Sequence, residues 1–453
     1  GGALSISNSA SANQPNRVRD VAALTLNGGA VDFTHPADGA SYAETLGAVS
    51  ITAGANVISA SRAAAGQTSA LTLTSLARTV GSVDFVGAGL GADARNRIFI
   101  SGQADGLIGP WATVNGSALA AYSSTLGVYP ADATAYADIA ARGPSSTIPD
   151  GGAAAAVRIN SSGVSGAIAL ANDATTIGSL LQNTATDAAV DTASKTLRAT
   201  SVVIPAGKAA VTLGIAAGDG TLAPALAGGA ISLANDGLST LTVNAVIADN
   251  ASASALVKSG AGAVKLAAAN TFSGSTSIGE GNLILANGNA LQNSTLTIGA
   301  AAPTFDSSVA SHAFAVGGLS GTKSLSLTDN AGAAVALAVG KNNASTAYSG
   351  ALSGSGSLVK QGNGTLSLSG ANTHQGGTTV SGGRLSADNY LALGTGPVTN
   401  NGTIDFTVAP VTYSGTAFSL SGSGTNNVSI LNIAGANTVF AGDYSAFTGV
   451  WNI

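Results

Sequence analysis

The chain has no cysteine and no methionine, and only 9% of its 453 residues are charged. Without cysteine, neither a disulfide framework nor a thiolate metal site can form. Charged residues make up about a quarter of an ordinary soluble domain, so this chain is strongly depleted in them. Disorder caused by charge repulsion is not expected, because 45% of the residues are hydrophobic and the net charge is only −5.

Other absences exclude several classes of function. The 17 lysines and arginines are scattered, so no basic stripe is available for nucleic acid or anionic lipid. No run of about 18 apolar residues occurs, so no transmembrane helix is expected. There is no P-loop and no G-x-S-x-G elbow, and His35, His312 and His374 lie far apart without a second ligand at metal-binding spacing. We therefore predict no enzyme activity, no cofactor and no metal site.

Glycine is the most prominent residue that is present, with 61 copies. It lacks the three-residue period that a collagen helix requires. Short runs containing Val, Ile and Thr alternate with turns rich in Gly and Asn, which is typical of an all-β chain.

An internal repeat is the clearest signal in the chain. The stretch ALVKSGAGAVKLAAANTFSGSTSIGEGNLILAN, beginning at Ala255, aligns without a gap with SLVKQGNGTLSLSGANTHQGGTTVSGGRLSADN, beginning at Ser357, so the offset is a constant 102 residues. Identical residues recur at matching positions, among them Leu256 and Leu358, Lys258 and Lys360, and Asn270 and Asn372. A random low-complexity segment would not keep this register, so the pattern predicts a repeat architecture.

Each copy consists of short alternating segments such as SLVK and GRLSA, each with one or two apolar side chains on one face. The turns between them are rich in Gly and Asn, which tolerate positive φ angles. Such segments are stable only when equivalent strands stack above and below them and create one continuous core. The pattern predicts an all-β fold, most simply a right-handed parallel β-helix, or β-solenoid.

Three similar segments, AVDF at 30–33, SVDF at 82–85 and TIDF at 403–406, indicate equivalent strand ends. Each places an aspartate before a phenylalanine, and these aspartates are Asp32, Asp84 and Asp405. Their recurrence, once per presumed unit, favours a structural position that caps a turn over a catalytic carboxylate pair.

The pattern GSGSLVKQGNGTLSLSGANTHQGGTTVSGGRLS resembles the autotransporter-associated β-strand repeat, which is found in passenger regions of large bacterial surface proteins. Residues 312–354 resemble the segment that leads into this motif, and residues 392–406 resemble its exit. The usual aromatic residue after Asn-Thr is Phe272 in one copy but His374 in the other, where we expect an exposed or stacking side chain. The resemblance implies a secreted β-helical stalk of a Gram-negative-type bacterium, with adhesion, surface coating and self-association as typical roles.

We predict three regions along the chain. Residues 1–91 form β-solenoid, and residues 92–158 form an irregular lobe that projects from it, with a short helix over 132–142. Residues 159–453 form β-solenoid again and contain the repeats at 255–304 and 357–406. The sequence begins in the middle of a repeat unit, and neither end has the polar cap that solenoids need. We therefore expect a fragment of a longer polypeptide, or a subunit whose ends are covered by neighbours.

Aromatic residues gather in the predicted lobe and are the candidate partner-binding residues: Trp111, Tyr122, Tyr129 and Tyr136. A flat group of such side chains can bind sugar or a partner protein. The alternative, which we favour, is that they pack the lobe onto the solenoid.

These observations predict a secreted, extracellular or cell-surface structural protein of a fibre, sheath or layer. Few charges oppose lateral packing, and uncapped strand edges recruit further strands, so self-association end to end or side by side is expected. One alternative is an adhesin passenger stalk that binds host or matrix glycans or proteins through the lobe. A weaker alternative is a β-helix enzyme that acts on polysaccharide.

Overall fold

The computed structural model describes residues 2–78, 81–143, 146–407, 412–428 and 439–452, so parts of the predicted 159–453 solenoid lie outside the described residues. Within these ranges the chain is all-β, and its helices are two single 3₁₀ turns, η1 (Ala10–Ala12) and η2 (Ala133–Ala135). Strands pair in parallel with the strand one coil earlier, which confirms the parallel β-solenoid. None of the described helices has the length and apolar character needed to cross a membrane.

The chain forms two compact units. Unit 1 comprises Gly1–Ala245, Asp249–Val264 and Ser277–Gly281, and unit 2 comprises Val246–Ala248, Lys265–Thr276 and Asn282–Ile453.

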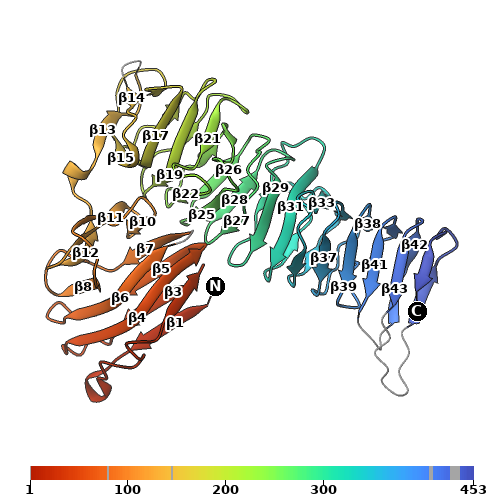
Figure 1. The fold of residues 1–453 in the computed structure, drawn as a ribbon, viewed down its shortest axis with the longest axis horizontal. Coiled ribbons are helices and arrows are strands. Elements are labelled where there is room, and N and C mark those ends of the chain that lie inside the picture. The colour runs from red at the N-terminus through yellow and green to blue at the C-terminus, as the bar shows by residue number, and fades with distance from the viewer. Residues whose placement is uncertain (1, 79–80, 144–145, 408–411, 429–438, 453) are drawn as a thin grey trace. The chain divides into compact units, whose positions relative to one another are not determined.

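Unit 1 begins with a first run of coils built from two parallel sheets (Figure 1). One sheet contains β1 (Ala3–Ser7), β3 (Ala30–Thr34), β5 (Ala55–Ala60), β7 (Ser82–Val86) and β10 (Ala112–Val114). The other contains β2 (Leu24–Asn27), β4 (Tyr42–Ala53), β6 (Ser69–Arg78) and β8 (Asn96–Ile100). Ala3 pairs with Ala30 and Ala30 with Val57, so these coils take 27 residues each, whereas the coil from Val83 to Ala112 takes 29.

Side-chain alternation explains why these segments enclose a core. In β3, Val31 and Phe33 have no exposed surface, whereas the intervening Asp32 is half-buried on the opposite face. Val31 pairs with Ile58 of β5, which pairs with Phe85 of β7, so inward residues form a column along the run. Burying each such side chain stabilises the folded state by about 2 kcal/mol. A single coil could not bury these side chains without neighbours above and below it.

The parallel pattern ends where an antiparallel segment follows. We call residues 106–136 the junction module; it contains β10 and η2 together with β9 (Gly106–Leu107), β11 (Ala118–Ser123) and β12 (Gly127–Pro130). β11 pairs antiparallel with β9, β10 and β12. Ala120 of β11 and Val128 of β12 join the core of the first run. The module therefore packs against the last coil of the first run.

The helix expected over 132–142 is wrong. η2 spans three residues, with the Asp132 carboxylate accepting a hydrogen bond from the Thr134 backbone N–H (2.9 Å), and β13 (Ala137–Ala140) follows. An isolated helix of about 11 residues is marginal in water, whereas the strand satisfies its backbone groups by pairing in parallel with the next coil. The boundaries of the irregular region also differ from 92–158, because parallel strands continue to Val114 and resume at Ala137.

A second run of parallel coils completes unit 1. Its main sheet contains β13, β15 (Gly152–Ser161), β17 (Ala174–Gln182), β19 (Thr196–Ile204), β21 (Thr221–Ala223), β22 (Ala230–Asn235) and β25 (Ala255–Ser259). A second sheet contains β18 (Ala188–Val190), β20 (Val211–Leu213) and β23 (Leu241–Val243), and β14 (Thr147–Ile148) pairs with β16 (Ala169–Leu170).

The main sheet of the second run is buried on both faces. In β22, Leu233 points into the solenoid core, whereas its neighbour Ser232 points away from that core and is still only 5% exposed. Val203 of β19 and Val257 of β25, on the same outer face, are each 1% exposed. The outer face of the first run, on β5, β7 and β10, covers this face of the second run. A small cavity lined by residues of both runs lies between the two faces.

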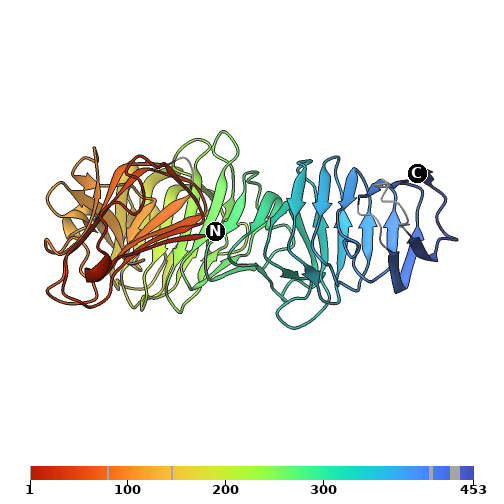
Figure 2. The ribbon, with the colours of Figure 1, turned by 90° about the horizontal axis from the view of Figure 1, so that it is seen from below.

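Unit 2 is itself a stack of parallel coils, which are shorter and whose strands lie side by side in Figure 2. Its strands are β24 (Val246–Ile247), β28 (Asn282–Leu285), β29 (Leu291–Ile298), β30 (Thr304–Phe305), β31 (Ala313–Gly321), β32 (Leu325–Ser326), β33 (Ala336–Val339), β34 (Thr346–Tyr348), β35 (Leu352–Ser353), β36 (Ser357–Lys360), β37 (Thr365–Leu368), β38 (Thr378–Val380), β39 (Arg384–Ala387), β40 (Val398–Asn400), β41 (Thr403–Phe406), β42 (Thr412–Ser421), β43 (Thr425–Val428), β44 (Val439–Asp443) and β45 (Val450–Asn452). Two further strands, β26 (Ala263–Leu266) and β27 (Thr276–Ile278), contain residues of both units. Leu358 of β36 pairs with Thr378 of β38, so this coil takes 20 residues.

Candidate functional site

Two of the four candidate aromatic residues pack against the core of the first run. Tyr122 is only 5% exposed, and its hydroxyl accepts a hydrogen bond from the backbone N–H of Ile100 (3.3 Å). Trp111 is half-buried against the same core, with the Arg78 guanidinium 5.5 Å from the centre of its ring. Tyr122 is therefore a packing residue, whereas Trp111 keeps part of its ring accessible.

The other two candidates are half-buried on the junction module. Tyr129 lies in β12, opposite Ala121 of β11. The Tyr136 hydroxyl accepts a hydrogen bond from the Leu119 backbone N–H (3.2 Å), and the Arg158 guanidinium lies 4.6 Å from the centre of its ring. Burial raises the pKa of the Tyr136 hydroxyl. The four side chains do not form one flat exposed surface, and a partner-binding role for them stays a prediction.

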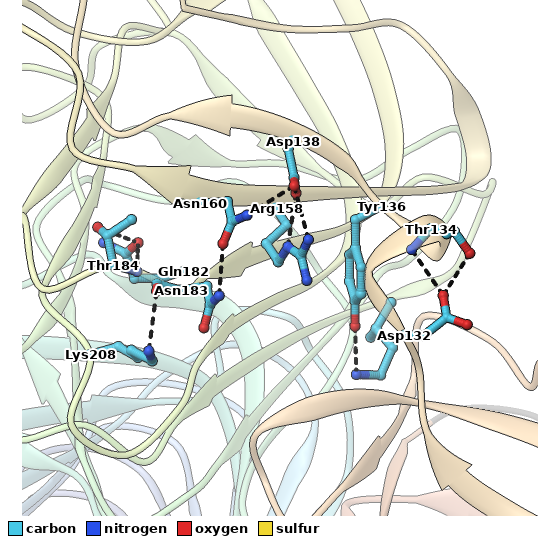
Figure 3. A network of polar contacts seen from close by, with 11 residues as sticks. Asp132, Thr134, Tyr136, Asp138, Arg158, Asn160, Gln182, Asn183, Thr184 and Lys208 are labelled. Atoms are coloured by element: carbon cyan, nitrogen blue, oxygen red, sulfur yellow. Dashed lines mark hydrogen bonds and ion pairs between the residues drawn. The ribbon is translucent and has the colours of Figure 1, made fainter.

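A row of hydrogen-bonded polar side chains begins beside Tyr136 (Figure 3). We call Asp138, Arg158, Asn160 and Asn183 the polar ladder. The Arg158 guanidinium donates two bonds to the Asp138 carboxylate (2.8 and 2.9 Å), which lowers the pKa of that carboxyl. Asn160 donates to Asp138 and Asn183 donates to Asn160, each at 2.9 Å. The ladder crosses three successive coils on the surface and presents amide and charged groups to solvent.

A cavity of about 120 Å³ lies between the two runs of unit 1. Its side-chain lining combines an indole, three carboxylates and several hydroxyls, from Trp111, Asp84, Asp236, Glu280, Thr113, Ser82, Ser201, Ser232 and Ser259. Glu280 is exposed at the rim, Asp84 and Asp236 are half-buried, and Ser201 is only 2% exposed. The titratable residues of the lining are all acidic, so the cavity carries a negative field.

The two half-buried carboxylates of this cavity have defined positions. One oxygen of Asp84 accepts hydrogen bonds from the Thr113 hydroxyl (2.8 Å) and from the Gly116 backbone N–H (2.9 Å). Gly116 has φ +59°, and a β-carbon there would collide with the Asp236 carboxylate, so glycine allows this close approach. Burial raises the pKa values of both the Asp84 and Asp236 carboxyls.

The expectation that the recurring aspartates cap turns is wrong for Asp32 and Asp405, whereas Asp84 does accept from the N–H of Gly116 in the turn after β10. Each lies within a strand, on the face opposite the buried phenylalanine, and accepts a hydrogen bond from the next coil. The donors are the Ser59 hydroxyl to Asp32 (2.8 Å), the Thr113 hydroxyl to Asp84 (2.8 Å) and the Asn427 amide to Asp405 (2.7 Å). Their shared role is to connect successive coils on the outer face.

Both copies of the repeat contain a buried lysine. Lys258 and Lys360 are 0% and 1% exposed. The Lys258 ammonium donates to three backbone carbonyl oxygens, at 2.7, 2.6 and 3.1 Å, and the Lys360 ammonium donates to three at 2.8, 3.0 and 3.2 Å. Burial lowers the pKa of both ammonium groups, and that of Lys258 falls to about 8. The lysine recurs because its ammonium closes the turn after its own strand.

Each copy also contains a buried asparagine that joins two coils. The Asn270 side chain accepts from the Ile247 N–H (2.8 Å) and donates to the Ala290 carbonyl (2.9 Å). Asn372 accepts from the Leu352 N–H (2.7 Å) and donates to the Ala392 carbonyl (2.6 Å). The repeated Asn-Thr signature is therefore structural.

The histidines are dispersed, and the exposed position expected for His374 is wrong. His374 is 0% exposed, its Nε2 lies 2.9 Å from the Thr378 hydroxyl, and burial lowers its pKa to about 4. His35 is also buried, stacked on Tyr42 with its Nε2 2.8 Å from the Ser69 hydroxyl. Across the described ranges, no group of three or more His, Cys, Asp or Glu side chains is arranged to hold a metal ion.

Comparison with known proteins places these repeats in a family. Residues 256–285 and 358–387 each match the passenger-associated-transport-repeat. The chain carries autotransporter passenger-type repeats. It is a secreted or cell-surface passenger region.

A curated relative extends the similarity beyond the repeats. This passenger region is 29% identical over 399 residues to the adhesin BmaC autotransporter of Brucella suis biovar 1 (strain 1330). The alignment covers 85% of the present chain but only 11% of that relative, so the chain spans about a tenth of the relative's length. No solved structure matches the chain.

Proposed function

We propose that the chain is part of an adhesin passenger, in which the solenoid is the scaffold and outward side chains make the adhesive contacts. The observation that carries this proposal is the similarity, over 85% of the chain, to a protein named as an adhesin autotransporter. Host or matrix glycans and proteins are the proposed targets, and the proposed role is not enzymatic.

The distribution of side chains supports a scaffold with a separate contact surface. The repeat-defining residues Lys258, Lys360, Asn270 and Asn372 are buried and bind backbone groups of their own and neighbouring coils, so they are occupied by the fold. Contacts with a partner must come from outward positions, where the sequence varies between the copies. The polar ladder beside Tyr136 is the proposed contact surface, because it combines amides, an ion pair and an aromatic ring at solvent.

Three of the four aromatic candidates stay in the proposal, because a half-buried side chain keeps some surface for a partner: Trp111, Tyr129 and Tyr136. Tyr122 is buried and supports them from the core. Self-association into a fibre, sheath or layer stays a prediction, which the similarity to an adhesin does not support.

Adhesion of coated beads tests the proposal. Beads carrying the full chain should bind to animal cell layers, or to immobilised matrix proteins, well above beads carrying albumin. A double variant of the ladder, Asp138→Ala with Arg158→Ala, should reduce binding several-fold. The matched control is Arg384→Ala with Asp405→Ala, which removes another ion pair at the surface. Wild-type beads that bind no better than albumin to any of these surfaces would refute the adhesin proposal.

A further inference from the structure

The cavity between the two runs of unit 1 has a lining that the scaffold role does not require. Solenoid surfaces that only pack together need apolar contact, as Val203 and Val257 provide on the same outer face. Here the lining instead brings together Asp84, Asp236 and Glu280. Asp84 and Asp236 accept hydrogen bonds from neutral O–H and N–H groups, but half-buried carboxylates gathered in one cavity stay costly without a positive charge nearby.

The compensating group is not a basic side chain of the lining. The cavity-lining residues include no lysine, arginine or histidine, and none of the ion pairs formed among the described residues involves these three carboxylates. Lys258 lies behind the wall, where its ammonium donates to three backbone carbonyls and also attracts Asp236 and Glu280. One ammonium balances at most one of three carboxylates, so negative charge inside the cavity is left for a cation from outside.

A second, independent observation comes from the buried hydroxyls. Ser232 is 5% exposed and points from β22 into the cavity, and its hydroxyl has no hydrogen-bond partner among the described residues. Ser82 of β7 is 8% exposed and lines the opposite wall, and its hydroxyl likewise has no hydrogen-bond partner among the described residues. The two hydroxyl oxygens open into the cavity, so each can accept a hydrogen bond from a group that enters it. Both walls thus present acceptors to a donor that would occupy the cavity.

The spacing of the carboxylates selects the kind of cation. Asp84, Asp236 and Glu280 do not form a cluster close enough to hold a metal ion, in the part of the chain that the structure describes. The volume of about 120 Å³ corresponds to about four waters at roughly 30 Å³ each, or to one small organic group. The indole of Trp111 on the wall suits an organic cation, which aromatic rings attract.

We propose that this cavity binds an alkylammonium group, whose three N–H donors are shared among the carboxylates of Asp84, Asp236 and Glu280 and the hydroxyls of Ser82 and Ser232, while Trp111 contacts its carbon chain. Glu280 at the exposed rim marks the entrance. The ammonium is that of a free amine or of a lysine side chain on another protein. The inference goes beyond adhesion and is independent of it, because small probes measure it on the isolated chain.

Tryptophan fluorescence gives a direct readout. The chain has two tryptophans, Trp111 and Trp451, so the full chain with Trp451→Phe emits from the cavity wall alone. This protein is titrated with 1,4-diaminobutane, with Nα-acetyl-lysine methylamide, with glucose and with sodium and calcium chloride at matched ionic strength. We expect a saturable change in emission with the two amines and none with the sugar or the salts. A response to the diamine alone would identify a free amine as the ligand, and a response to the lysine derivative would identify a side chain.

Variants separate the cavity from a nonspecific effect. Asp236→Asn keeps an oxygen that can accept from the Ala261 N–H (3.2 Å) but removes the charge, and it should weaken amine binding about tenfold. Ser232→Ala should weaken binding by a smaller factor with the fold intact. The matched control, Asp388→Asn in unit 2, should leave binding unchanged. The proposal is overturned by no saturable response to either amine, by an equal response to salt, by a response to glucose, or by equal binding to Asp236→Asn.

Discussion

The two copies of the passenger-type repeat can be compared position by position, because they are offset by a constant 102 residues. Their buried polar contacts are nearly the same. Asn270 and Asn372 each join two backbone groups, and Lys258 and Lys360 each donate to three carbonyls. Positions whose side chains bind the backbone keep their identity, because another residue type would leave those backbone groups unpaired.

The copies differ where a side chain only fills space or faces outward. Phe272 and His374 occupy the same buried slot, at 1% and 0% exposure, although one is apolar and the other titratable. On the outer face, Asn282 of the first copy matches Arg384 of the second. The first accepts a hydrogen bond from the Thr304 hydroxyl (2.8 Å), and the second forms an ion pair with Asp405. The comparison predicts large effects at the shared positions and small ones at the divergent positions.

Replacement of the buried asparagine should have the largest effect. Asn372→Ala leaves the Leu352 N–H and the Ala392 carbonyl without a partner, at about 1–3 kcal/mol each, so we expect a loss of about 4 kcal/mol. Asn270→Ala should cost a similar amount, measured by urea unfolding and local hydrogen exchange. The exposed Asn363→Ala is the control. If either buried variant unfolds like that control, the asparagine is not a structural element of the repeat.

Replacement of the buried lysine should come next and should distinguish the copies. Lys360→Met leaves three carbonyls without this donor, and we expect a loss of about 2 kcal/mol. Lys258→Met should cost about 3 kcal/mol, because Asp236 and Glu280 also attract its ammonium and would lose it. Unfolding curves of both variants, with exposed Lys323→Met as control, measure the difference. Equal losses would show that the cavity carboxylates do not act on Lys258.

Sequence alone predicts the solenoid because its signal is local and repeated. Alternation in segments such as SLVK identifies the strands, and the register of the two copies identifies their stacking. The buried Lys360 and Asn372 could also be marked as recurring residues, but their full set of partners could not, since it includes backbone groups one coil away. An exposed or stacking His374 is expected from its place in a repeat turn, whereas a hydrogen bond between its Nε2 and the Thr378 hydroxyl allows it inside.

The cavity could not be predicted, because it depends on two runs of coils that pack outer face to outer face. Asp84 comes from the first run and Asp236 from the second, 152 positions later in the sequence. One sequence signal does mark such a covered face. Leu180-Leu181 and Val202-Val203 are consecutive apolar pairs, which a strand exposed on one side would not contain. The helix expected over 132–142 does not form, because the parallel pairing of β13 with β15 outweighs the helix propensity of the local alanines.

Acidification should destabilise the protein at the buried position where the copies differ, which is His374 in the second copy. The pKa of His374 falls from 6.5 in the unfolded chain to about 4 in the folded one, because burial disfavours its charged form. The unfolded state then binds more protons between these values, so stability is full above pH 6.5 and is lost as the pH falls towards 4. At pH 5.5 the loss is about 1.4 kcal/mol.

His374→Phe, which copies the first repeat, should remove this acid sensitivity. Phe272→His should introduce it in the first copy. Urea unfolding at pH 5.5 and pH 8 measures both, and the two variants serve as controls for each other. A wild-type chain whose difference in stability between these pH values is unchanged by His374→Phe would exclude this residue as the cause.

The smallest effect is expected on the outer face. Arg384→Asn gives the second copy the residue of the first, and replaces an ion pair with a neutral side chain. Because the Arg384 side chain is 48% exposed, the pair is screened by solvent, and its loss should cost about 0.5 kcal/mol. That loss should vanish at high salt, where the wild-type pair is screened as well. Asn282→Arg is the reciprocal variant; it should gain nothing, because the uncharged Thr304 pairs with Ile284 where Asp405 pairs with Ser386 in the second copy. A loss above about 1 kcal/mol that persists at high salt would mean that outward residues also define the repeat.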